Sequence, residues 1–296
     1  MSGAKERLVG LTAQREALKP PIMPPHTGLT RRQFLVGSGI GMAAGALALE
    51  GIVLEPRRLE ISSHTLGTPR SGRDRLRLAV ITDLHLQEVS ELHHALAAAV
   101  HDANPDAILL VGDSIDHLDS FSLLSNFLQL LPPTGIRVAT LGNWEYWSKV
   151  DLNALRRTYE QGNTQLLVNE GLAIAPGAVL YGTDDWLAGN PTLEPLSNYQ
   201  GDNVVVLSHS PAFRDSLTVP HPNIRAILSG HTHGGQIAIG GWAPFRPPGS
   251  GRYVSGWYRG DGPDLFVSRG LGTSVIPVRL GSVPELALID WHPGLG

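Results

Sequence analysis

The sequence predicts an α/β fold, and three features of the chain support this prediction. Short apolar runs rich in Val, Ile and Leu recur along it, and such runs are typical of strands buried on both faces. Helical patterns separate the early runs, which favours alternating strands and helices. Each run ends in a side chain that can bind a metal ion, at the strand end where ligands bind in this fold class.

The composition is that of a folded globular protein. The chain has 296 residues, of which 42% are hydrophobic and 17% are charged, enough for one large domain or two modest ones. The formal net charge of −4 gives no broad attraction for nucleic acid, so no nucleic-acid partner is expected. Cysteine is absent while 12 histidines are present, so a metal site would use imidazole and carboxylate ligands.

The N-terminal part of the chain differs from the rest. A polar, Pro-rich stretch covers residues 1–30, and Arg31 and Arg32 then precede an uncharged run from Phe34 to Leu49. This run is shorter than the roughly 20 residues that span a bilayer comfortably. Paired arginines before a weakly hydrophobic run resemble a twin-arginine export signal. The alternative is a buried Ala/Gly helix that begins with two arginines.

A twin-arginine signal would make the translocase a partner and would direct export to the periplasm, the cell wall or the outer face of the cytoplasmic membrane. Association with the membrane or the wall is then possible. Cleavage near Ala46–Ala48 and retention as an anchor both stay open, as do Met1 and Met23 as the start. The rest of the chain shows no repeat and no second change in composition. We therefore expect a signal region over residues 1–55 and one domain over 56–296.

The predicted domain begins with an edge strand, because Leu59 and Ile61 alternate with polar neighbours. The buried strands then follow within residues 76–83, 106–113, 135–143, 203–209 and 224–233. Helical spacing of apolar residues after the first two of these predicts helices through Leu92, Leu96 and Val100, and through Leu123, Leu124, Phe127 and Leu131.

The polar side chains at the ends of these strands form a candidate metal site. They are Asp83, His85, Asp113, Asn143, His209, His231 and His233. Any one of them alone is more commonly a cap or a polar core residue, but together they follow five apolar runs in order. One ion usually takes three or four protein ligands, so this set favours two ions that share a carboxylate.

The motifs that carry these residues resemble those of the calcineurin-like metallophosphoesterase superfamily. In chain order they read DLH, GDSID, GNWE, SHSP and GHTHGGQ, within residues 76–236. The C-terminal stretch over 251–290 is similar to the bacterial YkuE-like branch, whose members are often exported or membrane-associated. The resemblance implies a four-layer α/β/β/α sandwich with the site at one rim.

The resemblance also implies roles for the candidate residues. The first of two divalent ions, typically Mn²⁺, Fe or Zn²⁺, would be held by Asp83, His85, Asp113 and His233. The second would be held by Asp113 as the bridging ligand and by Asn143, His209 and His231. Asp113, Asn143 and His209 are therefore also the expected catalytic residues.

A phosphoric ester hydrolase is the activity that follows from this resemblance. Two cations neutralise phosphate oxygens and lower the pKa of a water that attacks phosphorus. No side-chain nucleophile is needed, and the chain has neither a GxSxG elbow nor a GxxxxGK[ST] loop. The alternative is a metal-dependent binding protein for phosphorylated envelope molecules with little or no turnover.

The sequence departs from the family pattern at Trp144, where relatives have a His. Indole donates one hydrogen bond but cannot transfer a proton. General-acid catalysis, commonly worth about 10²- to 10⁴-fold, would then be missing or come from another group such as His117 or His94.

Trp144 shares its short segment with Tyr146 and Trp147. These aromatic side chains either pack the loop or form an apolar wall for the lipid or sugar part of a substrate. Further candidates for this wall are Trp186, Trp242 and Tyr253. An exported enzyme would meet phospholipids, lipid-linked sugars and cell-wall phosphate polymers.

Overall fold

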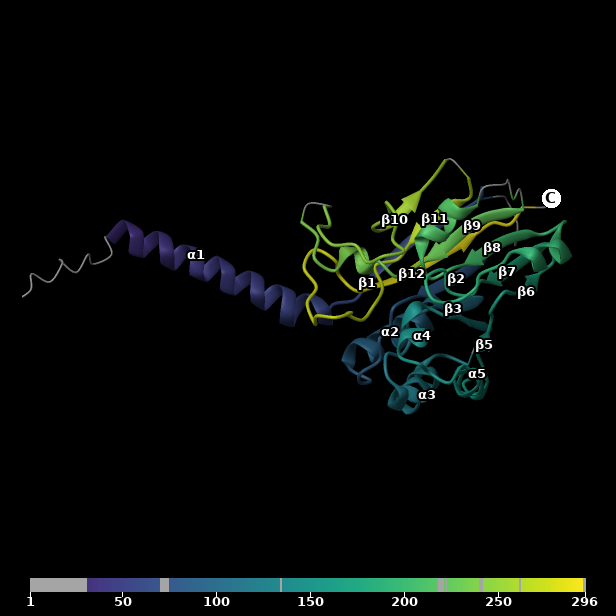
Figure 1. Ribbon diagram of the computed structural model, residues 1–296, viewed down its shortest axis with the longest axis horizontal. Coiled ribbons are helices and arrows are strands. Elements are labelled where there is room, and N and C mark those ends of the chain that lie inside the picture. The colour runs from purple at the N-terminus through teal and green to yellow at the C-terminus, as the bar shows by residue number, and fades with distance from the viewer. Residues whose placement is uncertain are drawn as a thin grey trace, which may run out of the picture. The chain divides into compact units, whose positions relative to one another are not determined.

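The computed structural model describes residues 31–69, 75–133, 135–217, 221, 223–239, 242–260 and 262–294. The chain divides into two compact units, Met1–Ala43 and Ala44–Gly296. In the first unit the structure describes the beginning of helix α1 (Arg31–Leu49). All of the sheets described below belong to the second unit (Figure 1).

Two six-stranded sheets form the centre of the second unit (Figure 1). In spatial order the first contains β1 (Glu60–Leu66), β12 (Glu285–Trp291), β2 (Leu76–Ile81), β3 (Ala107–Val111), β4 (Ile136–Thr140) and β5 (Gln165–Leu166). The second contains β10 (Gly256–Tyr258), β11 (Asp264–Val267), β9 (Ile224–Ser229), β8 (Asn203–Leu207), β7 (Ala178–Gly182) and β6 (Glu170–Ala175).

Most neighbouring strands are parallel, which brings the carboxyl ends of the central strands to one edge of each sheet. The antiparallel pairs are β12 with β2, β10 with β11, and β6 with β7. β2, β3, β4, β8 and β9 are buried along most of their length, as their unbroken apolar runs predict. β1 lies at a sheet edge, also as predicted.

The helices of the second unit are short. They are α2 (Glu91–Ala103), α3 (Phe121–Leu130), α4 (Asn143–Trp147) and α5 (Leu152–Gln161), with 3₁₀ helices η2 (Glu55–Arg57), η3 (Leu118–Ser120), η4 (Glu194–Tyr199), η5 (Pro211–Ser216) and η6 (His233–Gly235). A π-helical turn, η1 (Glu50–Leu54), follows α1.

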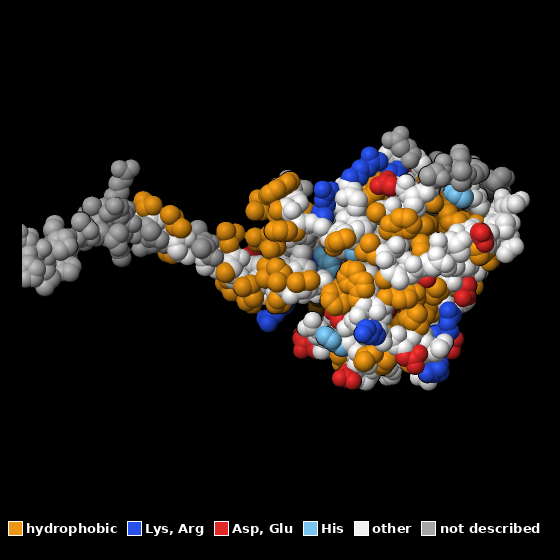
Figure 2. All heavy atoms as spheres, in the orientation of Figure 1, with side chains coloured by type: hydrophobic (Ala, Val, Ile, Leu, Met, Phe, Trp, Pro, Cys, Tyr) orange, Lys and Arg blue, Asp and Glu red, His pale blue; other side chains and the backbone are white. Residues whose placement is uncertain are grey.

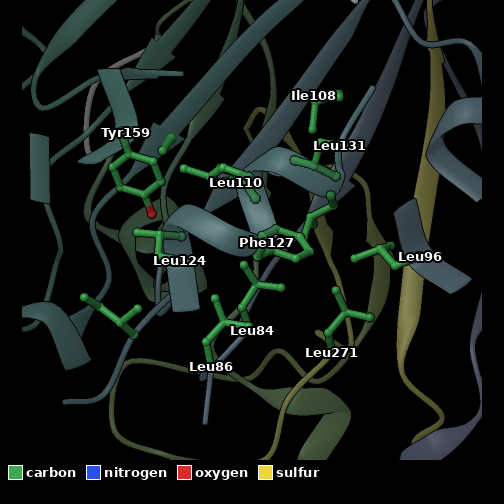
Figure 3. Packing of buried hydrophobic residues seen from close by; sticks show 14 of the residues in the cluster. Leu84, Leu86, Leu96, Ile108, Leu110, Leu124, Phe127, Leu131, Tyr159 and Leu271 are labelled. Atoms are coloured by element: carbon green, nitrogen blue, oxygen red, sulfur yellow. The ribbon is translucent and has the colours of Figure 1, made fainter. Parts of the chain in front are cut away.

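Three apolar clusters separate four layers and confirm the predicted sandwich. The first lies between the helices and the first sheet, where Leu96, Leu110 and Phe127 pack together (Figure 3). The second cluster lies between the two sheets. The third covers the outer face of the second sheet, where Phe213 of η5 and Leu196 of η4 pack. This fourth layer consists of 3₁₀ helices rather than α-helices, because both segments are short and begin with a proline at the first or second position.

Helix α1 carries the uncharged run of the N-terminal segment. Its last residues Leu47 and Leu49, which belong to the second unit, are 57% and 53% exposed. Within the described parts of the chain, no helix combines the length and the hydropathy that crossing a bilayer requires.

Candidate metal centre

Six of the predicted ligands lie in two groups beyond the carboxyl ends of β2, β3, β8 and β9. The first group is Asp83, His85 and His233, and the second is Asp113, His209 and His231. In each group the potential ligand atoms all lie within 4.8 Å of one another, and all six side chains are buried. Both sheets therefore contribute to one site. β2 and β3 are far from β8 and β9 in sequence, but all four strands end at the same rim.

The carboxylate of Asp113 lies between the two groups. Its Oδ2 is 3.0 Å from Nε2 of His209 in its own group and 3.7 Å from Nε2 of His85 in the other. Its Oδ1 accepts a hydrogen bond of 2.9 Å from the backbone N–H of Trp144. One oxygen is thus fixed by the backbone while the other faces both groups, as a bridging ligand requires.

Each of the four histidines is anchored through the ring nitrogen that points away from the centre. The partners are the Asp116 carboxylate for His85 (2.6 Å), the Val111 carbonyl for His209 (3.0 Å), the Pro248 carbonyl for His231 (2.6 Å) and the Gly272 carbonyl for His233 (3.2 Å). These partners only accept, so the outer nitrogen carries the proton in each neutral ring. The inner nitrogen then offers its lone pair to the centre, which is how metal-binding imidazoles are oriented.

The backbone that carries these ligands is strained. Five of the ligands have a positive φ angle, which residues other than glycine seldom adopt. They are Asp83 (53°), His85 (44°), Asp113 (52°), His231 (71°) and His233 (51°). Such strain is concentrated at functional sites, where the surrounding structure holds it in place. The neighbouring glycines are also required, because a Cβ at Gly142 would overlap the Asp113 carboxylate.

Asn143, the seventh predicted ligand, begins α4 and lines the same cavity as Asp113 and His231. Its side chain is buried, and its Oδ1 has no hydrogen-bond partner among the described residues. An unpaired carbonyl oxygen in a buried site is costly unless it binds a cation or another donor. Oxygen and imidazole ligands in this arrangement suit divalent first-row metals.

Comparison with known proteins identifies this arrangement. The sequence profile of the calcineurin-like phosphoesterase family matches residues 76–235, which contain all seven candidate ligands. The chain belongs to this family. The fold class and the family predicted from the motifs are therefore confirmed, and the protein is a metallophosphoesterase, a phosphoric ester hydrolase.

Several named bacterial proteins are similar to this calcineurin-like phosphoesterase over most of its length. The uncharacterized metallophosphoesterase YkuE of Bacillus subtilis (strain 168) is 29% identical, covering 88% of this chain and 96% of its own. Phosphodiesterase YaeI of Escherichia coli (strain K12) is 28% identical, covering 88% and 99%. YkoQ, also of Bacillus subtilis, is 30% identical, covering 73% and 83%. The first of these supports the predicted YkuE-like branch.

Calcineurin-like phosphoesterases use two divalent metal ions, and the residues of this chain fit that requirement. The two groups supply carboxylate and imidazole ligands for one ion each, with the Asp113 oxygen between them. This mixed nitrogen and oxygen set does not select among Mn, Fe and Zn.

Glu145 connects the two loops that carry Asp113 and Asn143. Its fully buried carboxylate accepts hydrogen bonds from the backbone N–H groups of Ser114 (2.7 Å), Gly142 (2.9 Å) and Asp113 (3.2 Å). The bond to Gly142 caps the N-terminus of α4. Glu145 was not predicted from the motifs to have a role, although an acid at the third position of a helix is a recognisable capping signal.

The charges at the site favour a bound cation. Burial lowers the pKa of His209, but the carboxylates of Asp113 and Asp83 outweigh burial and raise it well above its ordinary value. Burial likewise lowers the pKa of His231 to about 4 and that of His233 to about 3, so both rings are neutral near pH 7. Neutral imidazoles and ionised carboxylates are the forms that bind metal ions, so a metal ion bound here would displace the proton that the raised pKa of His209 retains.

A cavity of about 510 Å³ extends from the metal centre to the surface. Asp113, Asn143, His231 and His233 line its inner end. Its other walls are largely apolar and include Trp144, Trp147, Ile237, Phe245, Val275 and Ile276. Two of the three aromatic residues predicted for substrate contact therefore line it.

The third residue, Tyr146, is not among the residues that line this cavity, and its contact with substrate stays a prediction. Its hydroxyl donates a hydrogen bond of 2.6 Å to Asp184, and its ring packs against the first apolar cluster. Tyr253 is fully buried in the third cluster, so it is a core residue rather than part of the wall. Trp186 packs edge-to-face on Phe213, away from the cavity lining.

The candidate replacements for the family histidine also lie outside the cavity lining. His94 and His117 are both exposed on the surface. The ring of Trp144 instead packs edge-to-face against the ligand His85, with 6.0 Å between the ring centres.

Proposed function

We propose that this protein uses two divalent ions to hydrolyse a phosphomonoester or phosphodiester of an amphiphilic envelope molecule, such as a phospholipid or a lipid-linked or cell-wall phosphate. The observation that carries this proposal is the position of Asp113. Its Oδ2 faces both ligand groups at the inner end of a cavity whose outer walls are apolar. A phosphate would fit the polar end of that cavity and a lipid or glycan part the other.

When bound, two divalent ions neutralise phosphate oxygens and activate water. The residues of the chain hold this arrangement. Asp113 would contribute the carboxylate that the two ions share, and the four imidazoles are fixed in orientation through their outer N–H groups. Asn143 contributes its free carbonyl oxygen. The indole N–H of Trp144 can orient an oxygen of the substrate but cannot give a proton to the leaving group.

Arg246 supports an anionic substrate, because it is exposed and lines the same cavity. A guanidinium near the opening attracts a phosphate from solution or from a membrane surface. The apolar side chains Phe245 and Ile276, which also line the cavity, suit an alkyl chain.

The test is a substrate panel combined with metal analysis of the same sample. Full-length protein loaded with Mn²⁺ is assayed on p-nitrophenyl phosphate, bis-p-nitrophenyl phosphate and a series of phospholipids. The proposal predicts metal-dependent release, and higher kcat/KM on amphiphilic than on small esters. Absence of turnover on every substrate, with metal bound, would instead support a binding protein for phosphorylated molecules.

We also propose export by the twin-arginine route to the periplasm, the cell wall or the outer face of the cytoplasmic membrane. Arg31 and Arg32 before the uncharged run support this proposal. A reporter fused to the N-terminal segment should be exported, and the double change Arg31→Lys and Arg32→Lys should retain it in the cytoplasm. The double change Arg7→Lys and Arg15→Lys, within the same segment, is the matched control and should leave export unchanged, whereas export of the Arg31 and Arg32 variant would refute the proposal.

A further inference from the structure

Exposed apolar side chains gather around the opening of the cavity. Figure 2 shows hydrophobic side chains concentrated at the end of the sheet-containing unit where the loops after β9 and β11 lie. Trp242 is 67% exposed, Phe245 77% and Val275 91%, and Ile239 and Ile276 are also exposed. We call these five residues the apolar platform. Elsewhere after β1, the described chain has few large apolar side chains with comparable exposure.

The two loops of the platform are held together by hydrogen bonds. Gln236 donates from its side chain to the Ile276 carbonyl (2.8 Å) and accepts from the N–H of Ser274 (3.0 Å). The backbone N–H of Leu280 donates to the Gln236 carbonyl (2.9 Å). Ile239 and Trp242 pair through two backbone hydrogen bonds. The exposed side chains are therefore presented on a connected surface.

Residues 51–55 are bonded to the second loop of the platform. The backbone N–H of Arg279 donates to the Gly51 carbonyl (2.8 Å), and the Glu55 side chain accepts from the N–H of Gly281 (2.9 Å). Ile52 and Leu54, which lie between these anchors, are 54% and 42% exposed. Leu47 and Leu49, the exposed last apolar residues of the uncharged run, belong to the same unit, so the chain that follows them within a few residues is bonded to the second loop of the platform.

The platform is continuous with the wall of the cavity. Phe245, Val275 and Ile276 belong to both, whereas Ile239 and Trp242 lie outside the cavity lining. Exposed Trp and Phe beside apolar aliphatic residues are typical of surfaces that sit at the interface of a bilayer. The exposed cation Arg246 follows Phe245 directly and can face anionic lipid headgroups.

We propose that the apolar platform docks into the surface of a lipid bilayer, so that the cavity opens towards the lipid. The bilayer is favoured over a protein partner because exposed Trp and Phe lie next to the cation Arg246, and because the segment bonded to the platform adds the exposed Ile52 and Leu54. The purpose of the docking rests on the proposed function, since it would bring a membrane-embedded phosphoester to the metal centre. The docking itself can be tested without any turnover.

The absence of cysteine allows a direct test on the full-length chain. Single variants Trp242→Cys and Val275→Cys are labelled with the environment-sensitive fluorophore NBD and mixed with phosphatidylglycerol and phosphatidylcholine vesicles. Ile61→Cys is the matched control, because Ile61 is 50% exposed on the edge strand β1. We expect a blue shift and a several-fold rise in emission at 242 and 275 on vesicles, and no change at 61.

The proposal is overturned if the protein floats with vesicles while the labels at 242 and 275 stay as in water. It is also overturned if these labels shift without vesicles as the protein concentration rises, since a second copy would then cover the platform. The double variant Ile239→Ser and Trp242→Ser provides a functional arm. It should hydrolyse soluble bis-p-nitrophenyl phosphate like the wild type but lose at least about tenfold in rate on vesicle phospholipids. If the labels report docking but the protein hydrolyses no substrate, the proposed function is refuted and the docking proposal stands.

Discussion

The inner nitrogens of His85 and His233 lie 3.1 Å apart, with their rings stacked at 4.9 Å and tilted by 25°. The outer nitrogen of each ring donates to an acceptor, Asp116 for His85 and Gly272 for His233. In the neutral rings two lone pairs would face one another at this distance, which is unfavourable unless a cation or a proton lies between them. The pair is therefore suited to a cation, which the group of Asp83, His85 and His233 could hold.

Metal binding should stabilise the folded protein because the ligands come together only on folding. At 100 times Kd a ligand adds about 2.7 kcal/mol to the free energy of unfolding, which is about 5–10 °C in Tm for a domain of this size. Mn²⁺ or Zn²⁺ should raise Tm by this order, and EDTA should reverse it, as measured by differential scanning calorimetry. His233→Gln should lose most of the rise, whereas His101→Gln, whose side chain is 76% exposed, should keep it. Equal Tm values with and without metal would contradict the site.

Asp113→Ala should remove both bound metal and phosphodiester hydrolysis, because its Oδ2 faces both ligand groups. Metal content per chain is measured by atomic emission, and hydrolysis is measured on bis-p-nitrophenyl phosphate. Asp102→Ala on α2, whose side chain is 85% exposed, is the matched control and should retain both. An active variant at position 113 that binds no metal would refute the bridging role.

Glu145→Gln should weaken metal binding without removing any ligand. The carboxylate accepts three backbone N–H groups, whereas the amide of Gln would turn an N–H₂ donor towards some of them. The unpaired donors should cost about 1–3 kcal/mol in the free energy of unfolding. Displacement of the two ligand loops should weaken metal affinity by about 10- to 100-fold.

Isothermal titration with Mn²⁺ and urea unfolding give the two quantities for Glu145→Gln. Glu160→Gln, on the exposed side of α5, is the control for the same change of charge. A positioning role predicts weaker metal binding with kcat largely restored at saturating metal. Loss of kcat at full metal occupancy would instead mean that Glu145 acts in the reaction itself.

The strands and the metal ligands could be predicted because both leave local signals. Runs such as 107–111 are buried on both faces, and parallel strands deliver their next residues to one rim. The anchors of the histidines could not be predicted, since the carbonyls of Val111, Pro248 and Gly272 have no side-chain signature. The cavity wall depends on loops more than 90 residues away from Trp144 in sequence, so its partners are set by tertiary structure. Tyr253 was also misplaced, because aromatic residues occur both in cores and on surfaces and the sequence does not distinguish the two.

His93 should make stability depend on pH. Burial lowers the pKa of His93 to about 4, and its Nδ1 accepts a hydrogen bond from the Ser90 N–H at the start of α2. Between this pKa and the ordinary value near 6.5, the unfolded chain binds more protons than the folded one. The stabilisation is therefore complete above about pH 6.5 and is lost as the pH falls towards 4.

His93→Gln should flatten this pH dependence, because Gln can accept the same hydrogen bond but does not titrate. The slope of the free energy of unfolding against pH should fall by up to about 1.4 kcal/mol per pH unit in this range. Urea unfolding between about pH 7 and 5 measures this slope. His101→Gln, at an exposed position of the same helix, should keep the wild-type slope. An unchanged slope in His93→Gln would show that other groups dominate the acid sensitivity.

Trp144→His should restore a proton donor at the position where family members have one. The indole packs edge-to-face against His85 and against Trp147, and it lines the cavity beside Asp113 and Asn143. A histidine there could protonate a leaving alkoxide, which matters for alkyl esters and little for p-nitrophenyl esters. We expect kcat to rise at least about tenfold on an alkyl phosphodiester, which is less than the 10²- to 10⁴-fold that an established general acid contributes, and to change little on bis-p-nitrophenyl phosphate.

Trp144→Phe separates this chemistry from packing, because it removes the indole without adding an acid. A rise in Trp144→His alone, with a rate that falls as the new imidazole loses its proton, would show that the natural protein works without this acid and favours substrates with good leaving groups. Equal changes in both variants would mean that the indole matters through its shape. Its role would then be to form the apolar wall next to the metal centre. In that case both variants should lose more activity on lipid esters than on small esters.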